Sequence, residues 1–192
     1  MAIVVIGGQA RKVGKTSVVA GLIAALPEYH WTAVKISQHG HGEAWGITEE
    51  QARSGETDTS RFLAAGAVRA LWVRAEPGHL PDAVPELKRE LSRAENAIVE
   101  STRVLKFLRP DIFLLVLDPG NADFKDSARE FIDFADAIIL DERSGGVAFN
   151  TAEKRVFRIK PPTYVTPEIV SFVQGILSPK KPTQRTQGIQ RK

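Results

Sequence analysis

The residues best suited to chemistry lie in one loop near the start of the chain. This loop runs from Gly8 to Ser17 and contains Gly14, Lys15 and Thr16 in succession. Backbone N–H groups at the start of a helix point at anionic oxygens, and a glycine lets phosphate approach without a Cβ clash. A lysine after that glycine reaches the terminal phosphates of a nucleotide, and the next hydroxyl is a ligand for Mg²⁺. The loop therefore predicts binding of a nucleoside triphosphate.

The spacing of this loop differs by one residue from the usual phosphate-binding pattern. That pattern has four residues between its first glycine and the Gly-Lys pair. Here five residues separate Gly8 from Gly14, and Gln9 takes the usual position of the first glycine. The alternative interpretation is a turn that contains Gly-Lys-Thr without binding phosphate. Arg11 and Lys12 reach phosphate, either in their own subunit or in a dimer partner. The alternative is that both point to solvent. The predicted nucleotide contacts are Gly8, Gln9, Arg11, Lys12, Val13, Gly14, Lys15, Thr16 and Ser17.

Alternating strands and helices must hold this loop in place. Apolar runs rich in β-formers predict strands, and capped segments with helical periodicity predict helices between them. Such alternation is typical of a mostly parallel sheet with right-handed crossovers, and ligands bind at the carboxyl ends of its strands. We therefore expect an α/β fold with helices on both faces of the sheet. The expected strands are 2–8, 31–36, 68–73, 97–100, 111–117, 137–140 and 156–159, and the expected helices are 18–26, 60–65, 82–94, 127–135 and 167–177.

Charged side chains close three of the predicted strands. Glu100 ends strand 97–100, and Asp118 follows strand 111–117. Carboxylate oxygens are ligands that Mg²⁺ prefers, so either residue is a candidate for the metal site. For Asp118, which is followed by Pro-Gly, a turn is an equal alternative. Lys35 lies near the end of the second strand, where it either extends to solvent or faces the phosphate crevice.

A polar stretch at 37–57 contains four glycines and little periodicity, which predicts a long functional loop. His39 and His41 lie two residues apart within it. A metal site there would need Glu43 as a further ligand, and contact with a substrate is the preferred interpretation. The role of these histidines stays open.

Four polar residues elsewhere are further candidates. Asp58 and Arg61 share one face of a short helix, either as a surface ion pair or facing the crevice. Asp141 and Asn150 are alternative candidates for contact with the nucleotide base. None of these assignments follows from a specific motif.

Composition favours one globular domain, residues 1–177, followed by a basic tail at 178–192. The chain has 192 residues, a net charge of +3 and no cysteine, which excludes disulfides and thiolate metal sites. The tail has five basic and no acidic residues, so the body carries −2, the difference between +3 and +5. A disordered tail is therefore preferred over a nucleic-acid-binding arm. No apolar run is long enough for a membrane span, and we expect a cytoplasmic protein.

The extended loop is similar to the phosphate-binding loop of dethiobiotin synthetases and cobyrinic-acid amidases. The similarity rests on Gly8, five residues, then Gly14-Lys15-Thr16, and it extends to the strands that carry Lys35 and Glu100. The resemblance implies the P-loop NTPase fold. It also implies that Thr16 and Glu100 bind magnesium and that Lys35 meets a substrate.

From the second strand onward the chain resembles the molybdopterin-guanine dinucleotide biosynthesis adaptors of the MobB type. The shared features are Lys35, His39 and His41, then the segments 58–61 and 65–67, Asp-Thr-Ser-Arg and Ala-Gly-Ala. Ile36 stands where those adaptors have their first histidine. The resemblance implies a slow NTPase that acts as an adaptor in molybdenum cofactor biosynthesis, with a homodimer as the expected assembly.

We expect Mg²⁺ with ATP or GTP as the ligands. Lys15, Asp58 and Lys35 are the predicted catalytic residues, and Thr16, Glu100 and Asp58 are the predicted metal ligands. A partner would be a cofactor-biosynthesis enzyme or a small acidic substrate. Two alternatives stay open: an ATP-dependent small-molecule kinase or carboxylate-activating enzyme of the dethiobiotin-synthetase type, and a non-enzymatic, nucleotide-gated binding module.

Overall fold

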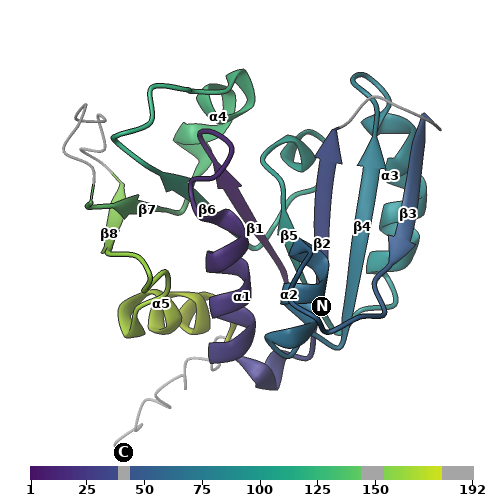
Figure 1. The fold of residues 1–192 in the computed structure, drawn as a ribbon, viewed down its shortest axis with the longest axis horizontal. Helices are drawn as coiled ribbons and strands as arrows, with labels where there is room; N and C mark the ends of the chain where they lie inside the picture. The colour runs from purple at the N-terminus through teal and green to yellow at the C-terminus, as the bar shows by residue number, and fades with distance from the viewer. Residues whose placement is uncertain (39–43, 144–153, 179–192) are drawn as a thin grey trace, which may run out of the picture.

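A single twisted sheet forms the centre of the protein. The computed structural model describes residues 1–38, 44–143 and 154–178 (Figure 1). Within these residues eight strands pair in the order β3-β4-β2-β5-β1-β6-β7-β8. All neighbours are parallel except β3, which runs antiparallel to β4. The expected α/β class and mostly parallel sheet are confirmed. The strands are β1 (Ile3–Gly8), β2 (Trp31–Gln38), β3 (Trp45–Glu49), β4 (Arg69–Ala75), β5 (Asn96–Glu100), β6 (Ile112–Leu117), β7 (Ala137–Asp141) and β8 (Arg155–Ile159).

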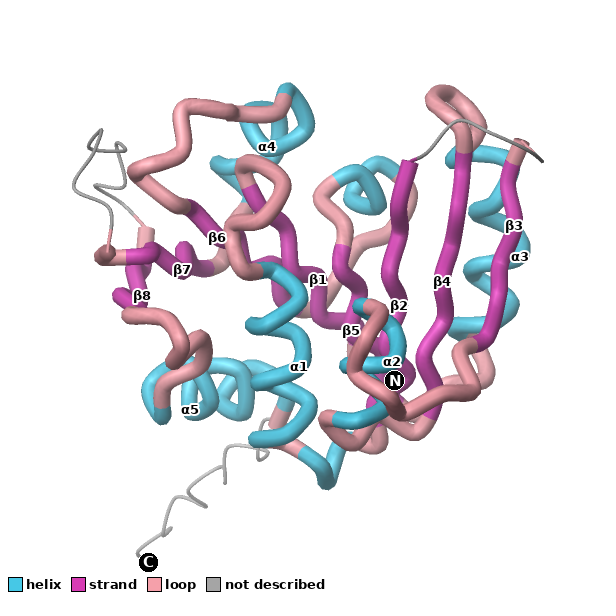
Figure 2. The backbone as a smooth tube through the Cα atoms, viewed as in Figure 1, coloured by secondary structure: helices cyan, strands magenta, loops and turns pink. Residues whose placement is uncertain are grey.

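Helices cover both faces of the sheet (Figure 2). One core lies between the sheet and helices α1, α2 and α5, and a second lies between the sheet and α3 and α4. Alternate residues of β1 enter different cores, because successive strand side chains point to opposite faces. The helices are α1 (Lys15–Ala25), α2 (Asp58–Ala64), α3 (Leu80–Leu91), α4 (Asp126–Phe131) and α5 (Pro167–Leu177), with short 3₁₀ turns at Pro27–Tyr29, Arg103–Lys106 and Ile132–Phe134.

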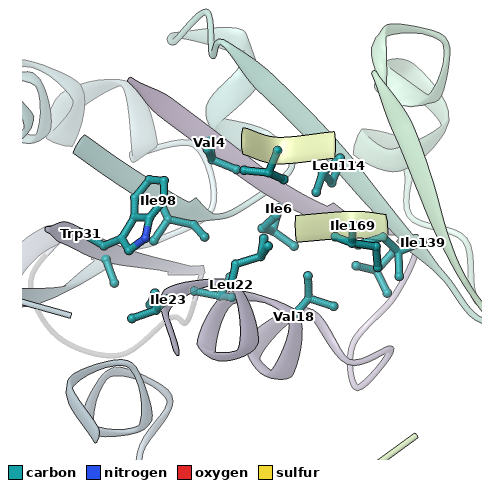
Figure 3. Close-up of a cluster of buried hydrophobic side chains, with 14 of the residues drawn as sticks. Val4, Ile6, Val18, Leu22, Ile23, Trp31, Ile98, Leu114, Ile139 and Ile169 are labelled. Atoms are coloured by element: carbon teal, nitrogen blue, oxygen red, sulfur yellow. The ribbon is translucent and has the colours of Figure 1, made fainter. Parts of the chain in front are cut away.

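The core beneath α1 fixes β1, the first strand, against this helix. Val4 and Ile6 of β1 pack with Val18 and Leu22 of α1, and all four are fully buried (Figure 3). Each such aliphatic side chain contributes about 1.5–3 kcal/mol by leaving water. The loop between β1 and α1 is therefore anchored at both ends by packed elements.

The prediction of one long loop at 37–57 is wrong in part. β2 continues to Gln38, and Trp45–Glu49 forms the edge strand β3. This strand exists because it pairs with β4, where Ile47 lies opposite Val73. Glycines within the stretch hid the strand pattern. Residues 39–43, which include His39, His41 and Glu43, lie outside the described residues, as do Asn150 and the tail beyond Ser178.

Four helices begin earlier than expected, α3 at Leu80 and α4 at Asp126 by two residues and one residue. α1 begins at Lys15, three residues before the expected start, because Gly14 already turns the chain into the helix. α2 begins at Asp58 with Thr57 as its cap, and the Thr57 hydroxyl accepts a hydrogen bond from Ser60 N at 3.0 Å. Of the described helices, none is both long and apolar enough to cross a membrane.

Candidate functional site

The loop from Gly8 to Gly14 lies at the carboxyl end of the central strand. Gly14 precedes α1 with a φ of 97°, and Lys12 has a φ of 61°. In the described part of the chain no side chain caps α1 at Gly14. The first N–H groups of this helix of 11 residues are therefore open to a ligand, and the helix dipole favours an anion there.

Tyr164, from the segment between β8 and α5, packs against Gly14 at the end of this loop. A Cβ atom added to Gly14 would lie 2.6 Å from Tyr164 Cε1. Glycine is therefore required at position 14 for two reasons, the positive φ and the close aromatic ring.

A Gly14→Ala substitution should lower the free energy of unfolding by about 2–4 kcal/mol, because backbone strain and the Tyr164 overlap add. Gly66→Ala is the matched control, since Gly66 has a φ of 109° with nothing within 4 Å of an added Cβ. The control should lose only about 1 kcal/mol. Urea unfolding of both variants measures the difference. Equal losses would show that Tyr164 moves aside freely.

Lys15 is the first residue of α1 and follows the loop directly. Its Nζ donates a hydrogen bond to Ala10 O at 2.7 Å. Burial lowers the pKa of Lys15 to about 8, with Glu100 opposing the change and with Lys125 and Lys35 adding to it. A phosphate beside this ammonium group would supply the negative charge that the buried site lacks.

Glu100 is the centre of a cluster of polar side chains next to the loop. Its carboxylate, on a side chain that is 2% exposed, accepts a hydrogen bond from Thr16 Oγ1 at 2.8 Å. It also accepts one from Lys35 Nζ, and the same ammonium lies 2.9 Å from Asp58 Oδ2. The cluster forms because Lys35 and Glu100 are neighbours in the β2–β5 register. The first turns of α1 and α2 bring Thr16 and Asp58 to the same place.

This cluster fits a divalent cation. Two carboxylates and a hydroxyl are hard oxygen ligands of the type that Mg²⁺ takes. A positive group, the Lys35 ammonium, already lies between Asp58 and Glu100. Across the described ranges no three histidine, cysteine or carboxylate side chains form a metal cluster. A metal at this place would therefore need phosphate oxygens or water as further ligands beside Thr16, Asp58 and Glu100.

A cavity of about 520 Å³ joins the loop and the Glu100 cluster. Arg61, from α2, lines it and donates a hydrogen bond to Ser17 Oγ at 3.1 Å. Seven basic and two acidic residues line the cavity, which gives a local charge of +5. The basic residues are Arg11, Lys12, Lys15, Lys35, Arg61, Arg103 and Lys125, and the acidic residues are Asp58 and Glu100. Such a field attracts polyanions.

Two of the predicted contact residues do not line this cavity, Gln9 and Val13. Val13 is buried in the core. The Gln9 side chain is also buried, and its amide nitrogen donates to Asp118 O at 3.0 Å and Asn121 O at 2.9 Å. Gln9 Oε1 accepts from Asp118 N at 2.8 Å. The residue in the place of the usual glycine therefore ties the loop to a neighbouring segment.

Asp118 and Asp141, the alternative candidates for the metal site and the base contact, do not line this cavity either. The Asp118 carboxylate accepts a hydrogen bond from Gly120 N at 3.0 Å, as expected for a residue that stabilises a turn. Asp141 is held by Arg143, whose NH2 donates to its Oδ2 at 2.7 Å, and this lowers the pKa of the Asp141 carboxyl. The Asp141 oxygens are thus engaged within the chain rather than offered to a base.

The cavity includes residues that sequence patterns did not single out. They are Arg103, Lys125, Ser127 and Tyr164, which come from segments beyond the strand ends. Arg103 lies three residues after Glu100, which closes β5, and that proximity was the one available signal. The position of Lys125 depends on the path of the segment that joins β6 to α4.

No protein-family model matches the chain, and no curated protein matches it significantly. Among solved structures, it is similar to LpxK from Aquifex aeolicus in complex with ATP, at 21% identity and a TM-score of 0.51. That match covers 82% of this chain and 53% of LpxK, so the chain spans about half of LpxK. HypB from Helicobacter pylori, solved with nickel, has 14% identity and a TM-score of 0.52 over 92% of this chain and 85% of HypB.

Bacillus subtilis MobB is also among the structural neighbours, at 17% identity over 92% of this chain and 98% of MobB. Its TM-score of 0.42 is too low to carry an argument. The matches to LpxK and HypB show a fold and no more, because their identity is low. The chain shares its fold with LpxK and HypB, and this fold is the P-loop NTPase fold.

Proposed function

We propose that this protein binds a nucleoside triphosphate, ATP or GTP, together with Mg²⁺ and hydrolyses it slowly. The observation that carries the proposal is the cluster beside Lys15, in which Glu100 accepts hydrogen bonds from Thr16 and Lys35 and Lys35 also pairs with Asp58. Phosphate chemistry needs a cationic loop and a metal site next to each other, and this cavity offers both. The fold alone would support nucleotide binding only as a general expectation.

Each residue has a role that follows from its position. The first N–H groups of α1 and the Lys15 ammonium hold the phosphates, while Thr16, Glu100 and Asp58 hold the metal. Mg²⁺, when bound, neutralises charge on the phosphate oxygens. Asp58 is less buried than Glu100, with side-chain exposures of 42% and 2%, so water can reach it, and it would act either as a second metal ligand or as the group that orients the attacking water. Lys35, which pairs with both carboxylates, would be the residue to contact the terminal phosphate if a metal ion were held there.

Catalysis in such a site consists of positioning and charge neutralisation, with little proton transfer by the protein. Among the described residues that line the cavity there is no histidine to act as a general base near neutral pH. Turnover is therefore expected to be slow unless a partner or second ligand completes the site.

We further propose an adaptor role in molybdenum cofactor biosynthesis, with a homodimer as the acting form. This finer proposal rests on the sequence resemblance around Lys35 and residues 58–61 and 65–67. It is supported by the position of Asp58 and Arg61, both of which line the cavity although a surface ion pair was the alternative.

Calorimetric titration with ATP and GTP, each with and without Mg²⁺, tests the main proposal. At least one nucleotide should bind with a Kd well below 1 mM, which corresponds to about 4 kcal/mol, and Mg²⁺ should strengthen binding. A comparison of the two triphosphates identifies the base. If neither binds below 1 mM in the presence of Mg²⁺, the proposed function is wrong.

A further inference from the structure

The nucleotide cavity does not end at the phosphate loop. A second hollow of about 530 Å³ adjoins it on the side of α3 and α4. Five residues line both spaces, so the two are direct neighbours. The shared residues are Gln38, Leu80, Arg103, Lys125 and Ser127. A molecule in the second hollow would therefore lie beside the phosphate end of a bound nucleotide.

Charge in the main cavity exceeds what a nucleotide needs. The lining residues sum to +5, with seven basic and two acidic side chains. A nucleoside triphosphate with its Mg²⁺ carries about −2 near neutral pH. About three positive charges therefore stay uncompensated after the proposed ligand binds. Four of these cations, Arg11, Lys12, Arg103 and Lys125, are exposed residues, so water screens part of their repulsion, and a second anion would lower what remains.

The surplus charge lies at the junction of the two spaces. Arg103 NH1 donates to the neutral amide oxygen of Gln38, and in the described residues neither Arg103 nor Lys125 has an ion pair. Burial lowers the pKa of Lys125, and the charges of Arg103, Arg11 and Lys35 add to this effect. Lys106, on the same wall, differs because Glu130 neutralises it at 2.8 Å.

Three basic and two acidic residues line the hollow, the acidic ones being Asp126 and Glu130, so its own net charge is +1, and apolar side chains form part of the remaining wall. Leu80, Pro81, Phe107 and Phe124 line the hollow around the two cations. Leu80 is also the first residue of α3, a helix of 12 residues, so the positive end of that helix faces the same space. Cations beside apolar walls suit a molecule with one anionic group and one apolar part.

We propose that this hollow is a second ligand site, for a small acid whose anionic group contacts Arg103 and Lys125 and whose apolar part packs on Leu80 and Phe107. The inference deepens the proposed function, on which it rests, by naming the class of the second ligand. The anionic group is a carboxylate or a phosphate, since both accept charge-assisted hydrogen bonds from arginine and lysine.

Octanoate, octyl phosphate and the neutral octanamide are the probes, titrated into the full chain while amide chemical shifts are recorded by NMR. The titrations are done with and without saturating Mg²⁺ and a non-hydrolysable triphosphate. One or both acids should bind with a Kd below 10 mM and at least tenfold more tightly than octanamide. Shifts should cluster at 78–81, 101–107 and 124–127. The two acids separate a carboxylate site from a phosphate site.

Arg103→Gln and Lys125→Gln should each weaken binding of the acid about tenfold, while Lys88→Gln, at an exposed position of α3 that lines neither space, should bind it as the parent does. The proposal is overturned if neither acid binds below 10 mM, if octanamide binds equally well, or if all three variants behave alike. Nucleotide binding is measured separately, so its failure with an intact acid site refutes the proposed function alone.

Discussion

A Lys15→Met variant is expected to bind Mg²⁺-nucleoside triphosphate roughly tenfold to a hundredfold more weakly than the parent protein. A charge-assisted hydrogen bond is worth about 1.5–3 kcal/mol, and methionine keeps the length of the side chain but loses the charge. Lys15 lines the phosphate cavity, and its ammonium contacts the loop carbonyl of Ala10. Calorimetry with the nucleotide that the parent binds better measures the loss.

The same substitution should not weaken the fold. Burial already lowers the pKa of Lys15 to about 8, which means that the charged form is held at a cost in free energy. Removing that charge should leave the free energy of unfolding equal to or above the parent value in urea. Lys88→Met, at an exposed position of α3, is the control and should change neither quantity. Unchanged nucleotide affinity in Lys15→Met would rule out this loop as the phosphate site.

A Lys35→Met variant is expected to be less stable than the parent by about 3 kcal/mol in metal-free buffer, and to recover most of that loss in millimolar Mg²⁺. Removing one partner of a buried ion pair leaves the other charge uncompensated, which costs about 3–5 kcal/mol. Here the partner left behind is Glu100, which is 2% exposed. A metal that binds the folded protein alone restores stability by mass action.

Unfolding curves with and without Mg²⁺, at matched ionic strength, give the measurement. The parent should gain less from Mg²⁺ than the variant, because its own ammonium already occupies the space between Asp58 and Glu100. The double variant Lys35→Met/Glu100→Gln should be more stable than Lys35→Met in metal-free buffer and should lose the response to Mg²⁺. An equal Mg²⁺ gain in parent and Lys35→Met would show that Lys35 and the metal do not share one site.

The predictable part of the site consists of residues that close strands. Glu100 and Lys35 were identified because parallel strands end at one edge of the sheet, and the structure brings both to the start of α1. The strand β3 was missed because its pairing with β4, more than 20 residues further along, defines it rather than its own pattern. Arg103 and Lys125 were missed because the path of a loop after a strand depends on packing that no local pattern records.

The unusual residue Gln9 has a consequence for how two ligands would affect each other. Its side chain bonds to both backbone groups of Asp118, and its carbonyl accepts a hydrogen bond from Lys125 N at 2.8 Å. One residue thus joins the phosphate loop to the segment that carries Lys125. A shift of the loop on nucleotide binding would be transmitted to the acid site, and linkage requires the reverse effect with the same free energy. Substitution of Gln9 would remove its side-chain bonds to Asp118 and leave the backbone bond to Lys125, so it would weaken such coupling without changing a residue that contacts either ligand.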